Sequence, residues 1–196
     1  MRKDKNDVIF YKIIRPLVKG FTMLVFHPKI VGKENITENG RLVLAGNHTS
    51  IFDCLLLVSS TKREIHFLAK DELWRGPKKI IFANLGLIPV NRRTKDPNAL
   101  TTAIEYLNSD NVIGIFPEGT IEKKKGEFLP FKIGAVKMAS VTSTPIVPFA
   151  ITGNYHIFSR NLTIKFGKPF YVDDKDLVLQ NKMLQTKIDK LKKGDK

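Results

Sequence analysis

His48 and Asp53 are the two residues of this sequence whose types and spacing best suit chemistry. His48 comes just after the apolar run 42–45, which is typical of a buried strand, and Asp53 follows five residues later. If a helix begins near Ser50, the carboxylate comes back within reach of the imidazole ring. A carboxylate on one ring nitrogen fixes the tautomer and raises the basicity of the other nitrogen, which can then take a proton from a hydroxyl group. The spacing therefore predicts a general base that activates an alcohol for attack on an activated acyl group, with no nucleophile supplied by the enzyme.

A purely structural interpretation explains the same residues. Ser50 and Asp53 stand three positions apart and precede the apolar run 54–58, which makes them a variant of a helix capping box. On this interpretation Asp53 serves only the start of the helix, and His48 is a polar residue on a loop. The pair by itself leaves both interpretations open, so other segments have to decide.

Further polar residues follow other expected strands. Glu118 and Thr120 offer acceptors for hydroxyl groups, and Gly119 between them permits a positive φ or the close approach of a ligand. Arg92 follows the apolar residues 87–90, and a guanidinium matches phosphate geometry. Lys70 follows the strand 65–69 and is a second candidate cation for a phosphate. As isolated features these are a plain turn and solvated basic residues, but ligands of open α/β sheets bind outside the carboxyl ends of strands.

Apolar segments alternate between strand and helix character along the chain. The expected strands cover residues 41–45, 65–69, 87–90, 112–116, 146–151 and 162–166, and the expected helices cover 51–60, 78–85, 97–107, 133–140 and 173–193. This alternation predicts an α/β layered domain with a mostly parallel or mixed central sheet. The sequence contains no internal repeat or interdomain linker, so residues 31–196 are expected to form one domain behind an N-terminal segment, residues 1–30.

The N-terminal segment is apolar but repeatedly charged. Residues 8–26 read VIFYKIIRPLVKGFTMLVF, in which Lys12, Arg15 and Lys19 interrupt the apolar background. That is too much charge for a membrane-spanning helix, and no cleavage site of a secretory signal follows. The pattern predicts an amphipathic helical segment that lies in a membrane interface, with a kink or two short helices at Pro16. The alternative is a helix packed on the core of this domain.

Composition limits the classes of function. Thirty-three Lys and Arg against nineteen Asp and Glu give a net charge of +14, which calls for nucleic acid, phosphorylated metabolites or anionic lipid as a partner. The single cysteine, Cys54, excludes an intramolecular disulfide, fits a reducing cytosol and is expected to be a buried apolar residue rather than a nucleophile. The sequence contains no zinc-ligand spacing, nucleotide-binding glycine motif or nucleic-acid motif.

Four ordered blocks together resemble one family. They are Asn47-His48-x4-Asp53, residues 86–92, Phe116-Pro117-Glu118-Gly119-Thr120, and the proline-containing strand 146–150. In this order they are similar to the glycerolipid acyltransferases, and most closely to the 1-acylglycerol-3-phosphate O-acyltransferases. The resemblance covers about residues 40 to 170. The second block departs from the family pattern at Pro89, where an aromatic residue is expected.

The resemblance implies roles for the residues already singled out. His48, oriented by Asp53, would take the proton of the sn-2 hydroxyl of lysophosphatidic acid, and the oxygen would attack the thioester of acyl-coenzyme A or acyl carrier protein. The implied substrate-binding residues are Lys70 and Arg92 for the phosphate, and Glu118, Gly119 and Thr120 for the glycerol part. The acyl thioester is a co-substrate, and no further cofactor and no metal is implied.

The expected localisation is the cytoplasmic face of the cell membrane, to which the protein would bind peripherally or monotopically through anionic lipids. One rival hypothesis keeps the chemistry but changes the acceptor, to glycerol 3-phosphate or another lysolipid. A second rival is a basic, non-enzymatic protein that binds membranes or nucleic acid. It accounts for the charge but not for His48, Asp53 and Glu118 at successive strand ends.

Overall fold

A seven-stranded sheet forms the centre of the molecule, in a computed structural model that describes residues 5–74, 86–91, 97–121, 129–158, 160–173 and 176–194. The strands are β1 (Lys29–Val31), β2 (Leu42–Gly46), β3 (Ile65–Lys70), β4 (Ile88–Val90), β5 (Val112–Ile115), β6 (Ile146–Thr152) and β7 (Thr163–Phe166). Their order across the sheet is β1-β7-β6-β2-β5-β3-β4. All neighbours pair in parallel except β6 and β7, which are antiparallel. The predicted α/β class with a mostly parallel, mixed sheet is confirmed.

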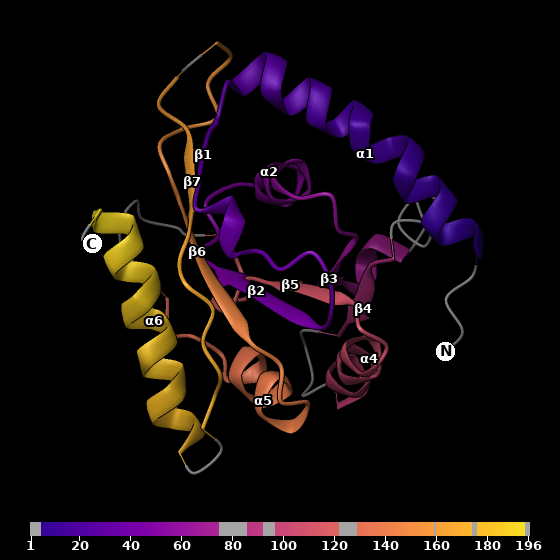
Figure 1. Ribbon diagram of the computed structural model, residues 1–196, viewed down its shortest axis with the longest axis vertical. Coiled ribbons are helices and arrows are strands. Elements are labelled where there is room, and N and C mark those ends of the chain that lie inside the picture. Colours follow the sequence, from indigo (N-terminus) through magenta and orange to yellow (C-terminus); the bar gives the residue numbers. More distant parts are fainter. Residues whose placement is uncertain are drawn as a thin grey trace.

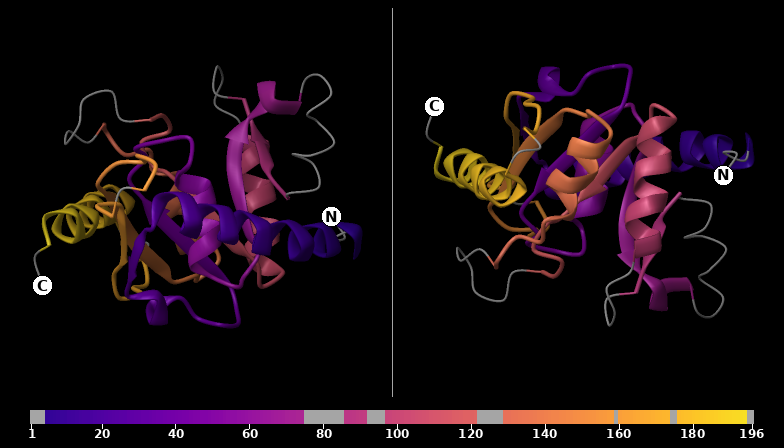
Figure 2. Two further views of the ribbon diagram at one scale, coloured as in Figure 1. Left: turned by 90° about the horizontal axis from the view of Figure 1, so that it is seen from above. Right: turned by 90° about the horizontal axis from the view of Figure 1, so that it is seen from below.

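Helices cover both faces of the sheet (Figure 1). They are α1 (Lys5–Phe26), α2 (Asp53–Ser60), α4 (Pro97–Asn108), α5 (Gly134–Val141) and α6 (Leu177–Lys193), with short 3-10 turns η1 (Lys33–Asn35) and η2 (Asp71–Trp74). Seen from above, α1 lies in front of α2, and seen from below, α4 and α5 lie in front of the sheet (Figure 2).

Strand β2 shows how the sequence builds these two layers. Because successive side chains of a strand point to opposite faces, Leu42 and Leu44 enter the core beneath α1 and α2, and Val43 and Ala45 enter the core beneath α4, α5 and α6. All four side chains are fully buried. A strand buried on both faces has a continuous apolar sequence, and the run 42–45 has that composition.

The expected elements and the structure differ at three places. The edge strand β1 was not predicted, since three residues with an exposed-intermediate-exposed pattern carry no apolar alternation of their own. The C-terminal helix is continuous and starts only at Leu177, where the side chain of Asp176 accepts hydrogen bonds from the N–H groups of Val178 and Leu179. The expected helix 78–85 falls outside the described residues.

Helix α1 is one continuous helix through Pro16, so two separate helices were a wrong expectation. Its buried face carries Tyr11, Thr22 and Phe26 and packs on α2. The hydroxyl of Tyr11 donates to the carbonyl of Arg63, and burial raises the pKa of this phenol to about 12. The helix therefore packs on the domain's own core, as the alternative interpretation proposed, while Ile13 on another face stays 59% exposed.

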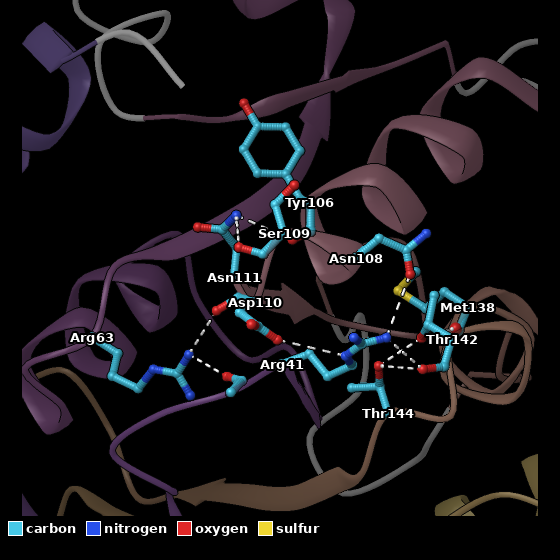
Figure 3. A network of polar contacts seen from close by, with 11 residues as sticks. Arg41, Arg63, Tyr106, Asn108, Ser109, Asp110, Asn111, Met138, Thr142 and Thr144 are labelled. Atoms are coloured by element: carbon cyan, nitrogen blue, oxygen red, sulfur yellow. Dashed lines mark hydrogen bonds and ion pairs between the residues drawn. The ribbon is translucent and has the colours of Figure 1, made fainter. Parts of the chain in front are cut away.

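At the amino ends of the strands, two arginines form hydrogen bonds to backbone carbonyls of neighbouring loops (Figure 3). Arg63 donates to the backbone carbonyls of Thr37, Gly40 and Asp110. Arg41 donates to the carbonyl of Thr142, 3.0 Å away, and forms an ion pair with the carboxylate of Asp110. Burial lowers the pKa of Arg63 from its ordinary value, and Asp110 opposes this shift.

Candidate active site

His48 and Asp53 meet at the carboxyl end of β2. The strand ends at Gly46, α2 begins at Asp53, and the turn between them brings the carboxylate to the imidazole. His48 Nδ1 lies 2.8 Å from Asp53 Oδ2, and the imidazole ring stacks on Phe116 with 4.2 Å between ring centroids. The side chain of His48 keeps 14% of its surface exposed, whereas that of Asp53 is fully buried. The predicted proximity of the two side chains is confirmed.

Several donors converge on the buried carboxylate of Asp53. Oδ2 accepts hydrogen bonds from the backbone N–H groups of Thr49 (2.6 Å) and Ser50 (2.9 Å), in addition to its contact with the ring of His48. Oδ1 accepts from the hydroxyls of Thr49 (3.1 Å) and Tyr155 (2.6 Å). These donors satisfy the acceptor positions of a carboxylate in the interior. As an acceptor, the carboxylate places the proton of a neutral His48 on Nδ1 and leaves the lone pair of Nε2 for a substrate.

The geometry around Asp53 fits the capping interpretation, and it also places the carboxylate where the catalytic interpretation requires it. The bond from the N–H of Ser50 to Asp53 is the carboxylate half of a capping box, although Phe52, with helical dihedrals, directly precedes the helix. The hydroxyl oxygen of Ser50 accepts from the N–H of Phe52, so this side chain also serves the turn. The helix start and the histidine share one carboxylate, which ties the orientation of the ring to the backbone.

Asn47 holds the exit of β2 against β6. Its side-chain Nδ2 donates to the carbonyl of Ile151 (2.9 Å), and its Oδ1 accepts from the N–H of the same residue (2.7 Å). Asn47 is buried, so this pair of bonds satisfies both polar ends of the amide in the interior. Just before it, the Phe149 ring lies over Gly46, where an added Cβ would come within 2.3 Å of the ring. The residue that precedes His48 is therefore fixed from two sides.

Glu118 binds backbone groups around the site. Its carboxylate accepts from the N–H of His48 (3.2 Å) through Oε1 and from the N–H of Leu129 (3.0 Å) through Oε2. Its side chain is buried, with a residue exposure of 4%. Glu118 thus braces the strand exit that carries the histidine, and the expected contact with the glycerol part of a substrate stays a prediction.

The turn after β5 places a cation beside Glu118. Gly119 has φ +73°, which glycine adopts without strain, and its N–H donates to the carbonyl of Phe116. A Cβ at this position would lie 2.8 Å from Lys132 Nζ, so the ammonium group of Lys132 lies against the turn. Since its N–H closes the turn, Gly119 is a poor donor for an oxyanion. Thr120 follows the turn and is exposed.

Of the two cationic residues expected to bind phosphate, the structure describes only Lys70. Lys70 ends β3 and is exposed at the carboxyl edge of the sheet. Strand β5 lies between β3 and β2, so Lys70 starts about 10 Å from the His48 strand, two strand spacings away. Arg92 lies outside the described residues.

The thiol of Cys54 is unsuited to nucleophilic attack, although it is next to Asp53 in the sequence. Burial and, to a smaller extent, the charge of Asp53 raise the pKa of Cys54 to about 12. The thiolate is the nucleophilic form of cysteine, and here it is suppressed. Among the described residues, no group of three or more His, Cys, Asp and Glu side chains is arranged to hold a metal ion.

Tyr155 was missed by the sequence analysis. It follows β6, whose carboxyl end lies next to that of β2, and it contacts Asp53 across 102 positions of sequence. The rule that ligands collect at the carboxyl ends of parallel strands applies to β6 as well. Applied to the expected strand 146–151, it would have drawn attention to this residue.

Comparison with known proteins identifies the class. A model of the acyltransferase family matches residues 27–152. The chain therefore belongs to the acyltransferase family of enzymes, which confirms the resemblance seen in the sequence blocks.

Particular relatives are more specific. The chain is 33% identical over 146 residues to a 1-acyl-sn-glycerol-3-phosphate acyltransferase of Borreliella burgdorferi, covering 73% of this chain and 58% of that relative. It is 32% identical over 173 residues to the enzyme of the same name from Bacillus subtilis, covering 84% of each. The crystal structure of the 1-acyl-sn-glycerophosphate (LPA) acyltransferase PlsC from Thermotoga maritima superposes with a TM-score of 0.74 at 26% identity, over 97% of this chain and 81% of that one.

Proposed function

We propose that this protein transfers an acyl chain from an acyl thioester to the sn-2 hydroxyl of 1-acylglycerol 3-phosphate, giving phosphatidic acid for phospholipid synthesis. The observation that carries the proposal is the 2.8 Å contact between His48 Nδ1 and Asp53 Oδ2 in a chain of the acyltransferase family. The names of the Borreliella burgdorferi and Bacillus subtilis relatives support this acceptor.

In the proposed reaction, His48 Nε2 accepts the proton of the acceptor hydroxyl while the oxygen attacks the thioester carbonyl. A carbon–oxygen bond forms, the tetrahedral intermediate collapses with loss of the carbon–sulfur bond, and His48 returns its proton to the departing thiolate. Asp53 keeps the ring in the reactive tautomer and stabilises the imidazolium that forms. The donor is acyl-coenzyme A or acyl carrier protein, and the thiol that leaves has the same chemistry in both cases.

Three cations are proposed to attract the acceptor phosphate. Lys70 and Arg92 follow strands at the carboxyl edge of the sheet, and Lys132 adds an ammonium group beside the turn at Gly119. A cationic surface raises the local concentration of an anionic substrate. Glu118 and Thr120 are proposed to orient the glycerol part within this field.

Helix α1 is proposed to bind the protein to the membrane that holds its substrate, on the cytoplasmic face. At about 100° per residue, the exposed apolar residues Ile13, Leu17, Phe21 and Leu24 lie on the side of the helix opposite its buried residues. Such a face favours insertion into the boundary between headgroups and acyl chains. No helix in the described part of the chain has the length and apolar character to cross a bilayer.

The test of the reaction uses purified protein, a radiolabelled acyl thioester and a panel of acceptors: 1-acylglycerol 3-phosphate, glycerol 3-phosphate and lysolipids with larger headgroups. Labelled phosphatidic acid from the first acceptor, at a rate at least tenfold above the others, is the expected result. Preference for another acceptor would reassign the substrate, and salt-sensitive DNA binding without any transfer would favour a non-enzymatic protein.

Membrane binding is tested by cosedimentation with anionic vesicles. Leu17→Asp places a charge on the exposed face of α1 and should weaken binding, whereas Val178→Asp does the same on exposed α6 and should not. Each side chain is about two-thirds or more exposed, so neither change disturbs the core. Equal binding by both variants would show that α1 is not the contact.

A further inference from the structure

Tyr155 connects the catalytic carboxylate to the surface of the protein on the side of α1. Its hydroxyl donates to Asp53 Oδ1 at 2.6 Å. Burial raises the pKa of this phenol well above its ordinary range, and the charge of Asp53 adds to the shift, so the hydroxyl stays protonated and remains a donor. Short bonds from a neutral donor to a carboxylate are among the stronger hydrogen bonds in proteins.

The ring of Tyr155 packs in a cluster of three aromatic residues. It meets Phe26 edge-on with 5.2 Å between centroids, and it meets Phe52 at 5.7 Å. Phe26 is the last residue of α1, and Phe52 directly precedes Asp53. The rings of Phe26 and Phe52 themselves lie 5.4 Å apart. The end of the membrane-facing helix and the start of the catalytic turn are thus packed on one tyrosine.

The same loop carries exposed apolar side chains. The N–H of Phe158 donates to the carbonyl of Val25 at 2.8 Å, which docks the loop on the C-terminal end of α1. Ile157 and Phe158 are 69% and 72% exposed, and Phe21 of α1, half exposed, meets Phe26 edge-on at 5.9 Å. The loop and the end of α1 therefore form one apolar surface that ends in the aromatic cluster, on a protein with net charge +14.

We propose that Tyr155 is a positioning residue through which contact of this apolar surface with a lipid bilayer holds the Asp53–His48 pair in its reactive geometry. This inference rests on the proposed function, because it assumes that His48 is the base. Thr49 and Tyr155 both donate to Oδ1 of Asp53, so loss of the Tyr155 hydroxyl removes the shorter of these two bonds and leaves Oδ1 held by Thr49. The occupant of the surface is a bilayer rather than a protein, since exposed aromatic and aliphatic residues on a cationic body match an anionic, apolar interface.

The test compares the full-length protein with Tyr155→Phe and with Tyr171→Phe, which removes a hydroxyl from a tyrosine that is 70% exposed elsewhere. Activity is measured on a short-chain acceptor in solution and on the same acceptor in anionic vesicles, and vesicle binding is measured by cosedimentation. Wild type and Tyr171→Phe should show a higher kcat with vesicles. Tyr155→Phe should bind vesicles normally, with a KM within about twofold of wild type. Its kcat should fall roughly 10- to 100-fold, by analogy with the loss on removing the hydrogen-bond partner of a metal-binding histidine, and vesicles should no longer raise it.

A second measurement does not depend on activity. The Nδ1 proton of His48, bonded to a buried carboxylate, should give a downfield proton resonance that is assigned by its loss in His48→Ala. This resonance should move in Tyr155→Phe and stay in place in Tyr171→Phe.

The outcomes separate this inference from the proposed function. An inactive His48→Ala together with a Tyr155→Phe of wild-type kcat and full vesicle stimulation would overturn the coupling and leave the proposed function standing. Absence of vesicle stimulation in the wild type would overturn the coupling as well. Full activity of His48→Ala would overturn the proposed function and this inference with it.

Discussion

At the two ends of the strands, charged side chains bind the backbone in opposite ways. At the carboxyl edge, the anions Asp53 and Glu118 accept hydrogen bonds from backbone N–H groups. At the amino edge, the cations Arg41 and Arg63 donate to backbone carbonyl groups (Figure 3). Helix starts leave unpaired N–H groups and helix ends leave unpaired carbonyls, so in an α/β layer anions suit one edge and cations the other.

The difference between the edges lies in what the charge contacts besides the backbone. The guanidinium group of Arg63 donates to backbone carbonyls, which neither titrate nor react at neutral pH. Asp53 accepts hydrogen bonds from backbone N–H groups and also contacts the ring of His48. This ring is partly exposed, and an imidazole can gain and lose a proton. The comparison teaches that bonds from a charged side chain to the backbone are ordinary at a strand end. The proposed site is distinguished by a fully buried charge that also holds a partly exposed imidazole ring.

The largest effect is expected from the ring itself. His48→Ala should reduce kcat by roughly 10²–10⁴-fold or more, because the proposed general base is lost together with its positioning. Stability should change little, since Asp53 keeps its backbone donors. Acyl transfer assays and thermal unfolding check both parts. Near-normal transfer by this variant would remove the mechanism and the proposed distinction between the edges.

Asp53→Asn should be the next most severe change and should differ in kind. It removes the charge that orients His48, and it places an amide where Thr49 and Ser50 donate, so both kcat and Tm should fall. Removing the orienting carboxylate costs less activity than removing the base in related catalytic triads, roughly tenfold to a hundredfold less. Measured kcat and Tm that both match wild type would contradict the assigned role of this carboxylate.

At the amino edge the expected effect is on stability alone. Arg63→Ala leaves three backbone carbonyls without their donor and should lower the free energy of unfolding by about 1–3 kcal/mol. Its kcat at a temperature where the protein is folded should equal that of wild type. The exposed neighbour Lys62 provides the matched control, since Lys62→Ala should leave urea unfolding unchanged. A large loss of kcat in folded Arg63→Ala would contradict the assignment of a purely structural role to the amino edge.

The smallest effect concerns the thiol beside the buried anion. With a pKa of about 12, only about 1 in 10⁴ of the Cys54 thiols is ionised at pH 8, so alkylation by iodoacetamide should be slow. Raising the pH toward 10 should speed the reaction in proportion to thiolate. Thr186→Cys, on the exposed side of α6, should react at the rate of an ordinary thiol and shows that the reagent is active. Rapid alkylation of Cys54 would mean that neither burial nor Asp53 suppresses its ionisation.

Local parts of this molecule were predictable from the sequence, and distant ones were not. The run 42–45 indicated a strand buried on both faces, and the five-residue spacing of His48 and Asp53 indicated a contact, because one turn of chain decides it. The contact of Tyr155 with Asp53 depends on β6 lying next to β2, which no local pattern specifies. Strand β1 likewise exists because it pairs with β7, more than 130 positions away. Lys70 ends β3 and Arg92 lies outside the described residues, so the phosphate contacts stay predictions.

The side chain of Asn47 continues the hydrogen-bond pattern between β2 and β6 by one residue beyond the end of β2. Its amide offers Ile151 the same donor and acceptor that a backbone peptide would offer, so β2 stops at Gly46 while the spacing of a paired strand continues. The backbone of residue 47 is thereby released from ladder geometry and can turn toward His48. An aspartate there would lose the donor, and an alanine would lose both partners, leaving a peptide group of β6 unpaired inside the protein. We expect substitutions of Asn47 to lower the stability of the protein far more than substitutions at the tip of the loop after β6.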